Sequence, residues 1–462
     1  MSANDILVCQ RVAFAAAPYP SAPERRANLK QLLSAILARQ DELAAAIDRD
    51  FGGRSRDEVL FSEIYVAVNA IRHARRHVSG WMAPRPRPVS WPLHPASAWV
   101  LPQPVGVVGI IVPWNYPIFL SMAPLAGALA AGNRVMLKPS ESTPETSALL
   151  ARMLADAFSP DLVTVVTGGV DVGREFASLP FDHLLFTGAT SVGRDVMRAA
   201  AGNLTPVTLE LGGKSPAIIA PDAHLDRAAA DIAYGKLLNS GQTCIAPDYV
   251  LLPGGLLRPF VDALRKAVER YYPGAQYTSI VNEKHYSRLG RYLEEARERG
   301  VEAISMGPAP RSERQIAPTV LIDPPEDLEV MREEIFGPIL PLKTYQTLED
   351  AIAYVNQRER PLALYLFARD RRTIDRVLTH TVSGGVSVND TLLHIAAEDL
   401  PFGGVGASGM GHYHGREGFD TFSKLKPVFR RHWLGLGRLL RPPHTRLHDW
   451  MQRILIGKRA GV

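Results

Sequence analysis

Short runs rich in β-branched residues alternate with helical segments from Val105 onward, and this alternation constrains the fold more than any other feature. The first series has strands at 105–112, 134–138, 162–166, 183–186 and 207–210 and helices at 117–131, 144–158, 170–178 and 191–201. A second series has strands at 215–220 and 248–252 and helices at 225–239 and 256–271, and further elements reach about residue 400. Repeated βα units specify doubly wound parallel sheets, whose ligands bind at the carboxyl ends of the strands. The predicted fold class is therefore α/β, with two doubly wound lobes and a cleft between them.

The 462 residues provide enough chain for two such lobes. Hydrophobic residues make up 46% and charged residues 21% of the chain, which is typical of a folded protein and excludes a disordered one. The first 80 residues are predicted to be helical. A helix over 23–50 would place on one face Leu29, Leu32, Leu33, Ile36 and Leu37. The Pro-rich residues 83–104 predict an extended hairpin that reaches a partner subunit.

Cysteine usage and the N-terminus bear on the cellular compartment. The two cysteines, Cys9 and Cys244, are too few for a disulfide framework or a four-cysteine zinc site, which indicates a reducing compartment. The N-terminus lacks the pattern of a signal peptide, so we expect a cytoplasmic protein. Residues 88–133 carry no charged side chain, but prolines interrupt them, and no run of about 20 apolar residues remains to span a membrane.

The net charge of +5 is concentrated at the C-terminus. Residues 424–462 hold ten Lys and Arg and one acid, so the remaining chain is slightly acidic. A nucleic-acid-binding protein normally carries its basic stripe on the folded body. We therefore expect no nucleic-acid partner.

Residues 433–462 form a basic tail that predicts an amphipathic helix. The apolar residues at helical spacing and the nearby cations are Leu447, Trp450, Met451, Ile454 and Leu455, with Arg446, Arg453, Lys458 and Arg459. The apolar face would either dock on the protein body or a partner subunit, or attach peripherally to an anionic membrane. The helix is too short to span a bilayer.

Cys244 lies in a polar, glycine-containing loop, Asn239-Ser-Gly-Gln-Thr-Cys-Ile-Ala-Pro, between a predicted helix and a predicted strand. Thiolates attack carbonyl carbons, and a thiol with a reference pKa of about 8.5 needs only modest electrostatic help to ionise near neutral pH. Cys244 is therefore a candidate nucleophile. The alternative is a structural cysteine that packs as a small hydrophobic residue.

Two polar residues end predicted strands and would face the same cleft. Partial burial at the end of its strand would raise the pKa of Glu210 toward the range of a general base, and the alternative is a carboxylate paired with Lys214. The amide of Asn115 can donate a hydrogen bond to a developing oxyanion. The spacing alone favours a simple turn residue at Asn115 over an oxyanion donor.

No G-x-G-x-x-G sequence follows the first predicted strand, which offers only Gly106 and Gly109, so the standard dinucleotide-binding pattern is missing there. Lys138 and Glu141 close the second strand with a cation and a carboxylate suited to ribose hydroxyls. Residues 188–193 link a strand to a helix whose backbone N–H groups could bind a pyrophosphate. These two features take the place of the missing pattern.

Seven segments resemble aldehyde dehydrogenases, in the family's order and along nearly the whole chain. They are Pro113-Trp-Asn-Tyr-Pro, Lys138-Pro-Ser-Glu, Phe186-Thr-Gly-Ala-Thr-Ser-Val-Gly, Glu210-Leu-Gly-Gly-Lys-Ser-Pro, Gly241-Gln-Thr-Cys, Glu333-Glu-Ile-Phe-Gly-Pro and Pro401-Phe-Gly-Gly-Val-Gly. The residues around Cys244, Val388-Asn-Asp and Gly409-Met-Gly-His-Tyr-His-Gly further resemble the class-three branch, which includes coniferyl and fatty aldehyde dehydrogenases.

The resemblance implies catalytic roles for three residues. Cys244 would be the nucleophile, Glu210 the general base, and Asn115 with the Cys244 backbone N–H the oxyanion donors. Thiolate attack on the aldehyde would give a thiohemiacetal, and hydride transfer would leave a thioester. Water activated by Glu210 would then release the carboxylic acid, and no metal is required.

The resemblance also implies a cofactor, which is NAD, with NADP as the alternative. Its adenosine ribose, pyrophosphate and nicotinamide would contact the residues Trp114, Lys138, Glu141, Gly188, Gly193, Glu334 and Phe336.

A domain organisation follows from the same resemblance. The NAD-binding domain would comprise 1–82 and 105–210, and the catalytic domain would comprise 211–423, with its last part returning toward the NAD-binding domain. Residues 83–104 and about 424–432 would form a bridging segment through which two copies make a homodimer.

The substrate is predicted to be an aromatic, coniferyl-type aldehyde, and a medium- or long-chain aliphatic aldehyde is the alternative. The candidate wall residues Tyr116, Ile118 and Phe402 are apolar, which disfavours highly polar semialdehydes. From another class, the same Cys and Glu could serve a cofactor-free thioesterase. Reduction of a nicotinamide on addition of aldehyde separates these functions.

Overall fold

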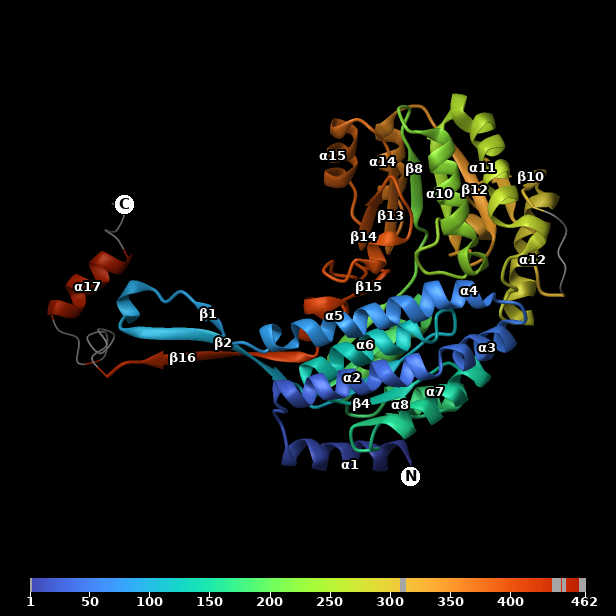
Figure 1. Cartoon of the computed structure of the whole chain (residues 1–462). Helices are drawn as coiled ribbons and strands as arrows, with labels where there is room; N and C mark the ends of the chain where they lie inside the picture. Colours follow the sequence, from blue (N-terminus) through green and yellow to red (C-terminus); the bar gives the residue numbers. More distant parts are fainter. Residues whose placement is uncertain (1, 308–312, 434–441, 443–445, 457–462) are drawn as a thin grey trace.

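The α/β class predicted from the alternation is confirmed by the computed structural model, which describes residues 2–307, 313–433, 442 and 446–456 (Figure 1). The strands form a six-stranded sheet, a seven-stranded sheet and a separate three-stranded sheet. The strands and helices predicted between 105 and 271 agree with the observed ones to within two residues at each end.

The chain forms its helices and strands in the following order. The helices are α1 (Ala3–Ala16), α2 (Ala22–Ala38), α3 (Gln40–Phe51), α4 (Arg56–Val59), α5 (Val66–Trp81), α6 (Phe119–Ala131), α7 (Pro144–Ala157), α8 (Val170–Ala177), α9 (Thr190–Ala201), α10 (Leu225–Leu237), α11 (Leu257–Tyr271), α12 (Glu283–Glu298), α13 (Glu329–Arg332), α14 (Leu348–Asn356), α15 (Arg371–His380), α16 (Gly415–Thr421) and α17 (Arg446–Ile456). The strands are β1 (Arg85–Arg87), β2 (Ala96–Pro104), β3 (Val107–Ile111), β4 (Arg134–Lys138), β5 (Val163–Val165), β6 (His183–Thr187), β7 (Val207–Glu210), β8 (Pro216–Ile219), β9 (Tyr249–Pro253), β10 (Glu302–Ser305), β11 (Thr319–Ile322), β12 (Ile339–Tyr345), β13 (Ala363–Phe367), β14 (Gly385–Val388), β15 (Gly409–Met410) and β16 (Ser423–Arg431).

The six-stranded sheet has the order β15-β7-β6-β3-β4-β5, and all its strands are parallel except β15. Successive residues of a strand point to opposite faces. Val108 and Ile110 of β3 pack with α2, α5, α6 and α7, whereas Val107 packs with α1, α8 and α9 on the other face. The sheet is therefore buried on both sides, as its almost continuously apolar strands predict.

The seven-stranded sheet has the order β10-β11-β12-β9-β8-β13-β14, and all its strands are parallel except β10. Helices α10 and α11 cover one face, and α14 and α15 cover the other. The chain crosses from the first sheet to the second between β7, which ends at Glu210, and β8. It returns through β15, where Gly409 pairs with Glu210.

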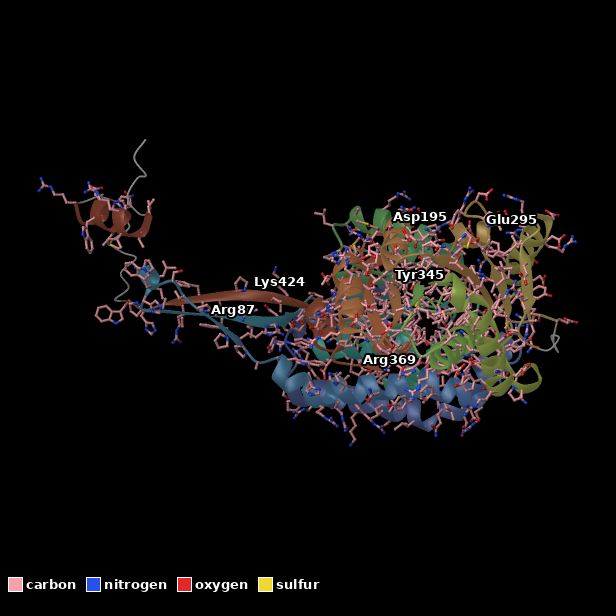
Figure 2. All side chains as sticks on the ribbon, turned by 90° about the horizontal axis from the view of Figure 1, so that it is seen from above. Arg87, Asp195, Glu295, Tyr345, Arg369 and Lys424 are labelled. Atoms are coloured by element: carbon pink, nitrogen blue, oxygen red, sulfur yellow. The ribbon has the colours of Figure 1, made fainter. Side chains whose placement is uncertain are left out.

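Strands β1, β2 and β16 form an antiparallel sheet that projects from the two lobes, with Arg87 and Lys424 labelled on it in Figure 2. We call this projection, residues 85–104 and 423–431, the arm. Helix α17 lies beyond the far end of the arm, away from both lobes (Figure 1). Within the described residues, no helix combines the length and the apolar character that crossing a membrane requires.

The single helix predicted over 23–50 is wrong, because two helices occupy these residues. Helix α2 ends at Ala38, and Arg39, with φ −122° and ψ 18°, turns the chain into α3. Four of the five leucine and isoleucine positions are buried as predicted, but Leu37 is 39% exposed. Leu37 follows Ile36 by one residue, and a helix rotates by about 100° per residue, which carries Leu37 away from the packed face.

Helix α6, which follows the loop that carries Asn115, is buried along its whole length and has a buried charged side chain at each end. Glu63 accepts hydrogen bonds from the two backbone N–H groups of 118–119, at 2.7 and 3.1 Å. Arg25 donates to the two carbonyl groups of 130–131, at 3.0 and 2.6 Å. These charges match the helix dipole and satisfy groups that the helix ends leave unpaired. The contacts therefore hold both ends of α6 in place, next to the loop that carries Asn115.

Replacing Arg25 with Met leaves these two buried carbonyl groups without their donor. Each unsatisfied buried group costs about 1–3 kcal/mol, so we expect the thermal unfolding midpoint to fall by about 2 °C or more. The exposed neighbour provides the matched control, and Arg26→Met should leave the midpoint unchanged within about 1 °C. Differential scanning fluorimetry measures both shifts, and equal midpoints for Arg25→Met and the wild type would contradict the capping role.

Candidate active site

A cleft with a volume of about 1070 Å³ lies where the two lobes meet, beside the crossover from β7 to β8. The loops after β3, β6 and β7 line one side of this cleft, and residues of the second lobe line the other. Seven predicted site residues line it, namely Trp114, Asn115, Gly188, Glu210, Cys244, Glu334 and Phe336. The structure therefore brings the three candidate catalytic residues into one cavity with four of the candidate cofactor residues.

The loop that presents Cys244 begins with a left-handed turn. Helix α10 ends two residues before its predicted end, and Asn239 and Ser240 both have φ of 52°, followed by Gly241 with φ of 75°. A left-handed conformation costs a non-glycine residue about 1–3 kcal/mol. At Gly241 a Cβ atom would lie 2.4 Å from the carbonyl oxygen of Gly337, so only glycine fits there.

Hydrogen bonds from Gln242 and Asn239 hold this turn. The Gln242 side chain donates to the carbonyls of Asn239 and Ser279, both at 3.0 Å. The Asn239 side chain donates to the carbonyls of Gln242 (3.2 Å) and Asn115 (3.0 Å). These bonds offset the backbone strain and fix the position of Cys244.

The Cys244 thiol is partly exposed and lines the cleft, so a ligand can reach it. Burial raises the pKa of the thiol above its ordinary value, and the negative charges of Glu334 and Glu210 raise it further. The neutral thiol is therefore the resting form near pH 7. Attack on a carbonyl carbon requires that the thiol first lose its proton.

Glu210 is the last residue of β7 and is only 2% exposed. The alternative pairing with Lys214 is wrong, because Lys214 contacts Asp248 and donates to the carbonyls of Val330 and Glu333, both at 2.8 Å. Neither carboxylate oxygen of Glu210 has a hydrogen-bond partner among the described residues. Burial raises the pKa of Glu210 well above its usual range. A carboxyl group of this kind can exchange a proton with a ligand or a water molecule near neutral pH.

Asn115 follows β3 and is 2% exposed. Its side-chain amide donates to the carbonyl of Gln242 at 3.1 Å. Its own carbonyl accepts hydrogen bonds from Arg54 (3.0 Å) and from Asn239 (3.0 Å). Since an amide nitrogen carries two hydrogens, the second can donate to a ligand in the cleft. Both the side-chain amide and the backbone carbonyl of Asn115 are thus held by hydrogen bonds, which a simple turn residue does not require.

These three groups form a constellation suited to chemistry at a carbonyl group. The thiol of Cys244 can add to the carbonyl carbon, the amide of Asn115 can stabilise the resulting oxyanion, and the carboxyl group of Glu210 can take or return a proton. The arrangement can therefore form a covalent intermediate on sulfur and release it to water.

The remainder of the cleft fits a dinucleotide. Helix α9 begins at Thr190 without a side-chain cap, so the backbone N–H groups of its first turn are available to a phosphate at the cleft. The carboxylate of Glu334 lies against Gly212, where a Cβ atom would be 2.0 Å from it. Its Oε1 atom is buried and has no hydrogen-bond partner among the described residues, which suits a ribose hydroxyl. Burial raises the pKa of Glu334 to about 8.

Aromatic side chains line the part of the cleft next to Glu334. The ring centroids of Trp114 and Phe336 are 5.3 Å apart at an interplanar angle of 77°. The Trp114 ring also lies 4.9 Å from the ring of His285 on α12. Such a surface fits a flat heteroaromatic ring.

Three of the candidate cofactor residues lie outside the lining of this cleft. Lys138 Nζ pairs with Glu141 Oε2 at 3.0 Å at the carboxyl end of β4. Gly193 lies in the first turn of α9, where a Cβ atom would be 2.6 Å from the Leu211 side chain. Gly193 therefore permits close packing of the helix on the loop after β7.

In the part of the chain that the structure describes, no group of three or more His, Cys, Asp or Glu side chains is placed to hold a metal ion. His414, a residue of a metal-binding type, lies between the aromatic rings of Phe402 (5.0 Å) and Phe119 (5.8 Å). Burial lowers its pKa to about 3, so this imidazole is neutral at physiological pH.

Four residues at or beside the cleft were missed by sequence reasoning. His285 and Arg288 lie on α12, and Arg288 donates to the carbonyl of Glu334 at 3.2 Å. Arg54 and Glu58 belong to the N-terminal segment that was interpreted only as packing helices. Glu58 and Arg288 lie on helices, and Arg54 lies in the connection between α3 and α4. A charged residue in either setting has the same local pattern whether it faces solvent or a distant loop, so no sequence signal separates these three residues from surface charges.

Comparisons with known proteins agree over most of the chain. A family model described as "Aldehyde dehydrogenase family" matches residues 6–428. A probable coniferyl aldehyde dehydrogenase from Pseudomonas aeruginosa is 54% identical, with 94% of this chain and 92% of that protein covered. Aldehyde dehydrogenase family 3 member A2 from Mus musculus is 41% identical, with 91% and 87% covered.

Solved structures show the same similarity. The substrate-bound state of Staphylococcus aureus AldH has a TM-score of 0.93 and 37% identity, with 98% of this chain and 99% of that chain covered. A Mycobacterium tuberculosis aldehyde dehydrogenase complexed with NAD⁺ has a TM-score of 0.84 and 30% identity, with 94% and 91% covered.

The raised pKa of Cys244 can be tested without any substrate. In a Cys9→Ser variant Cys244 is the only cysteine in the chain. We expect the rate of its alkylation by iodoacetamide to rise with pH, with a midpoint above about 8.5, because only the thiolate reacts and burial disfavours it. Second-order rate constants measured across the pH range give this midpoint, and a value at or below about 8.5 would contradict the environment described.

Proposed function

This chain belongs to the aldehyde dehydrogenase family, and we propose that its substrate is an aromatic aldehyde of the coniferyl type. The chain is an enzyme that oxidises aldehydes with a nicotinamide cofactor, NAD, with NADP as the alternative. The observation that carries the proposed substrate is the similarity of almost the whole chain to the probable coniferyl aldehyde dehydrogenase of P. aeruginosa.

An aromatic cluster near the reacting groups supports this substrate. Phe402 stacks on His414 at 5.0 Å and contacts the ring of Tyr413 at 5.8 Å. Burial raises the pKa of Tyr413, and the charges of Glu210 and Cys244 raise it further, so the cluster lies within electrostatic range of both. Tyr413 Oη and both ring nitrogens of His414 lack hydrogen-bond partners among the described residues. The cluster does not line the cleft, and it supports an aromatic substrate only through the aromatic surroundings that it gives the site.

We assign the formation of the covalent intermediate to Cys244 and Asn115. The Cys244 thiol first gives its proton to water, and the resulting thiolate forms a bond to the aldehyde carbon while the carbonyl electron pair moves to the oxygen. The resulting oxyanion accepts hydrogen bonds from the Asn115 amide and from the Cys244 backbone N–H. When bound, the nicotinamide supplies an acceptor for hydride. Loss of hydride from the tetrahedral carbon leaves a thioester on Cys244.

We assign release of the product to Glu210. Its carboxylate takes a proton from water, and the hydroxide oxygen forms a bond to the thioester carbon. The carbon–sulfur bond then breaks, the thiolate of Cys244 leaves with the electron pair, and the carboxylic acid is released. The raised pKa of Glu210 makes its carboxylate a stronger base than an exposed one.

The cofactor contacts are proposed as follows. Glu334 holds the nicotinamide ribose, Phe336 and Trp114 border the ring, and Gly188 and Gly193 flank the pyrophosphate at the start of α9. Lys138 and Glu141 hold the adenosine ribose. The carboxylate of Glu141 favours NAD, because a 2′-phosphate would lie close to its negative charge.

The proposed function is tested by aldehyde-dependent formation of NADH. We expect kcat/KM for coniferyl-type aldehydes to exceed that for long-chain aliphatic aldehydes by at least about tenfold, roughly 1.4 kcal/mol of transition-state binding.

Cys244→Ala should abolish oxidation but retain NAD binding, and Cys9→Ser, the matched control, should keep full activity. Residual activity of Cys244→Ala above about a tenth of wild type would refute the nucleophile, and a preference for aliphatic aldehydes would refute the substrate. Absence of NADH formation with hydrolysis of thioesters would indicate the thioesterase.

Glu210→Gln should stall the second half of the reaction. Stopped-flow absorbance should show a burst of NADH followed by a slow steady state, because the thioester forms but water is not activated. In the wild type the steady-state rate should fall as pH drops through the raised pKa of Glu210, since the base is then protonated, and Glu210→Gln should remove this dependence. An equal loss of burst and steady state would instead place Glu210 in an earlier step.

We propose that the arm joins two copies of the chain into a homodimer. Large apolar side chains are exposed along the arm and just beyond it, namely Trp91, Leu93, Leu425, Phe429 and Trp433. Clustered exposed apolar residues on a projecting sheet mark a protein contact surface. The described part of the tail adds Trp450, Ile454 and Ile456 of α17, which are also exposed. The predicted cations Lys458 and Arg459 lie outside the described residues.

We propose that α17 covers the partner subunit, with an anionic membrane surface as the alternative occupant. Light scattering at micromolar concentration should give twice the mass of one chain, and a monomer would refute the dimer. A chain that ends at Arg431 should then behave like the full chain in sedimentation with anionic vesicles at low salt. If the full chain sediments with the vesicles and the shortened chain does not, α17 contacts the membrane.

A further inference from the structure

Arg54 is a fully buried charged residue that the mechanism does not use. Its guanidinium donates hydrogen bonds to Glu58 (3.0 Å), Glu63 (2.8 Å), the hydroxyl of Ser62 (3.1 Å) and the carbonyl of Asn115 (3.0 Å). Only the last of these partners lines the cleft. Arg54 therefore connects the N-terminal helices to the loop that carries the proposed oxyanion donor.

Glu58 extends this connection to the Cys244 loop. Its Oε1 atom accepts hydrogen bonds from Arg54, from the backbone N–H of Asn239 (3.2 Å) and from the hydroxyl of Thr278 (3.1 Å). Asn239 is the first residue of the left-handed turn. The carboxylate therefore holds the backbone at the point where the strain begins.

The two connections meet at the carbonyl of Asn115, which accepts hydrogen bonds from both Arg54 and Asn239. Arg54, Glu58, Asn239 and Asn115 thus form a closed ring of hydrogen bonds. Asn115 and the Cys244 loop come from different lobes, and this ring ties them together through Arg54 and Glu58, which do not line the cleft.

The shape of Arg54 suits it to this task. Its planar guanidinium lies against the rings of Phe51 (5.2 Å) and Tyr116 (4.7 Å), which limits its movement. The fixed fork of N–H groups reaches carboxylates and a carbonyl at the same time, which the single ammonium group of a lysine cannot do.

We propose that Arg54 and Glu58 are positioning residues that set the distance between the Asn115 amide and the Cys244 backbone N–H. This role rests on the proposed function of those two donors. A misplacement of about 1 Å costs a preorganised site on the order of a hundredfold in rate, so a loosened ring should slow any step that develops an oxyanion.

The test uses acylation of Cys244 by p-nitrophenyl acetate, which needs no cofactor. The thiolate forms a bond to the ester carbon, the carbon–oxygen bond breaks, and nitrophenolate leaves with the electron pair. This step develops an oxyanion, whereas alkylation of the same thiol by iodoacetamide does not. We expect Glu58→Ala to slow acylation by at least about tenfold and to change alkylation by less than about threefold.

Conservative and control variants sharpen this comparison. Glu58→Gln keeps the acceptor oxygen and should restore acylation to within about threefold of wild type. Ser62→Ala removes a bond of Arg54, and Thr278→Val removes a bond of Glu58, without touching Asn115 or Asn239. Both controls should acylate within about threefold of wild type. Arg54→Lys and Arg54→Met should show the same selective loss of acylation as Glu58→Ala. If the Arg54 variants do not fold, the result for Glu58→Ala tests the proposal.

Acylation of Glu58→Ala within about threefold of wild type would overturn the proposal. Equal losses of acylation and alkylation would also overturn it, because they indicate general disruption of the loop. If the wild type reacts with the ester but does not oxidise aldehydes, the proposed function fails while the positioning role is still measured.

Discussion

The left-handed turn at 239–241 is the constraint on which the rest of the site depends. It ends α10 early and directs the chain so that Cys244 reaches the cleft beside Glu210 and Asn115. Two of its three residues are not glycine, so the turn costs about 1–3 kcal/mol at each and does not persist on its own. The stabilising hydrogen bonds come from Gln242, from the Asn115 loop and from Glu58 near the N-terminus. The position of Cys244 is therefore a property of the assembled lobes.

The same assembly controls charge in the cleft. Burial raises the pKa of Glu210, of Glu334 and of the Cys244 thiol. Ionisation of either carboxylate further disfavours the thiolate, so the three groups titrate together. In their neutral forms these three groups add no negative charge to the cleft, and the unpaired oxygens of Glu210 and Glu334 are ready to accept hydrogen bonds from a ligand.

Sequence patterns predicted the fold because βα alternation and apolar strands report local structure, and the family resemblance identified the correct enzyme class. Patterns failed where the outcome depends on contacts between distant segments. The helix over 23–50 is broken at Arg39, Leu37 faces outward, and α10 stops before a turn whose hydrogen bonds come partly from Asn115 and Glu58, which are far away in the sequence. Arg54 lies in the short connection between α3 and α4, and only the structure shows its contact with Asn115.

The central claim is that aldehyde oxidation proceeds through a thioester on Cys244. The most direct measurement is mass spectrometry of enzyme quenched in acid during the first turnover with aldehyde and NAD, followed by proteolysis. The account predicts that the peptide containing Cys244 gains the mass of the acyl group of the substrate and loses it on treatment with hydroxylamine. Turnover without any acyl group on this peptide, or with the acyl group on another residue, would contradict it.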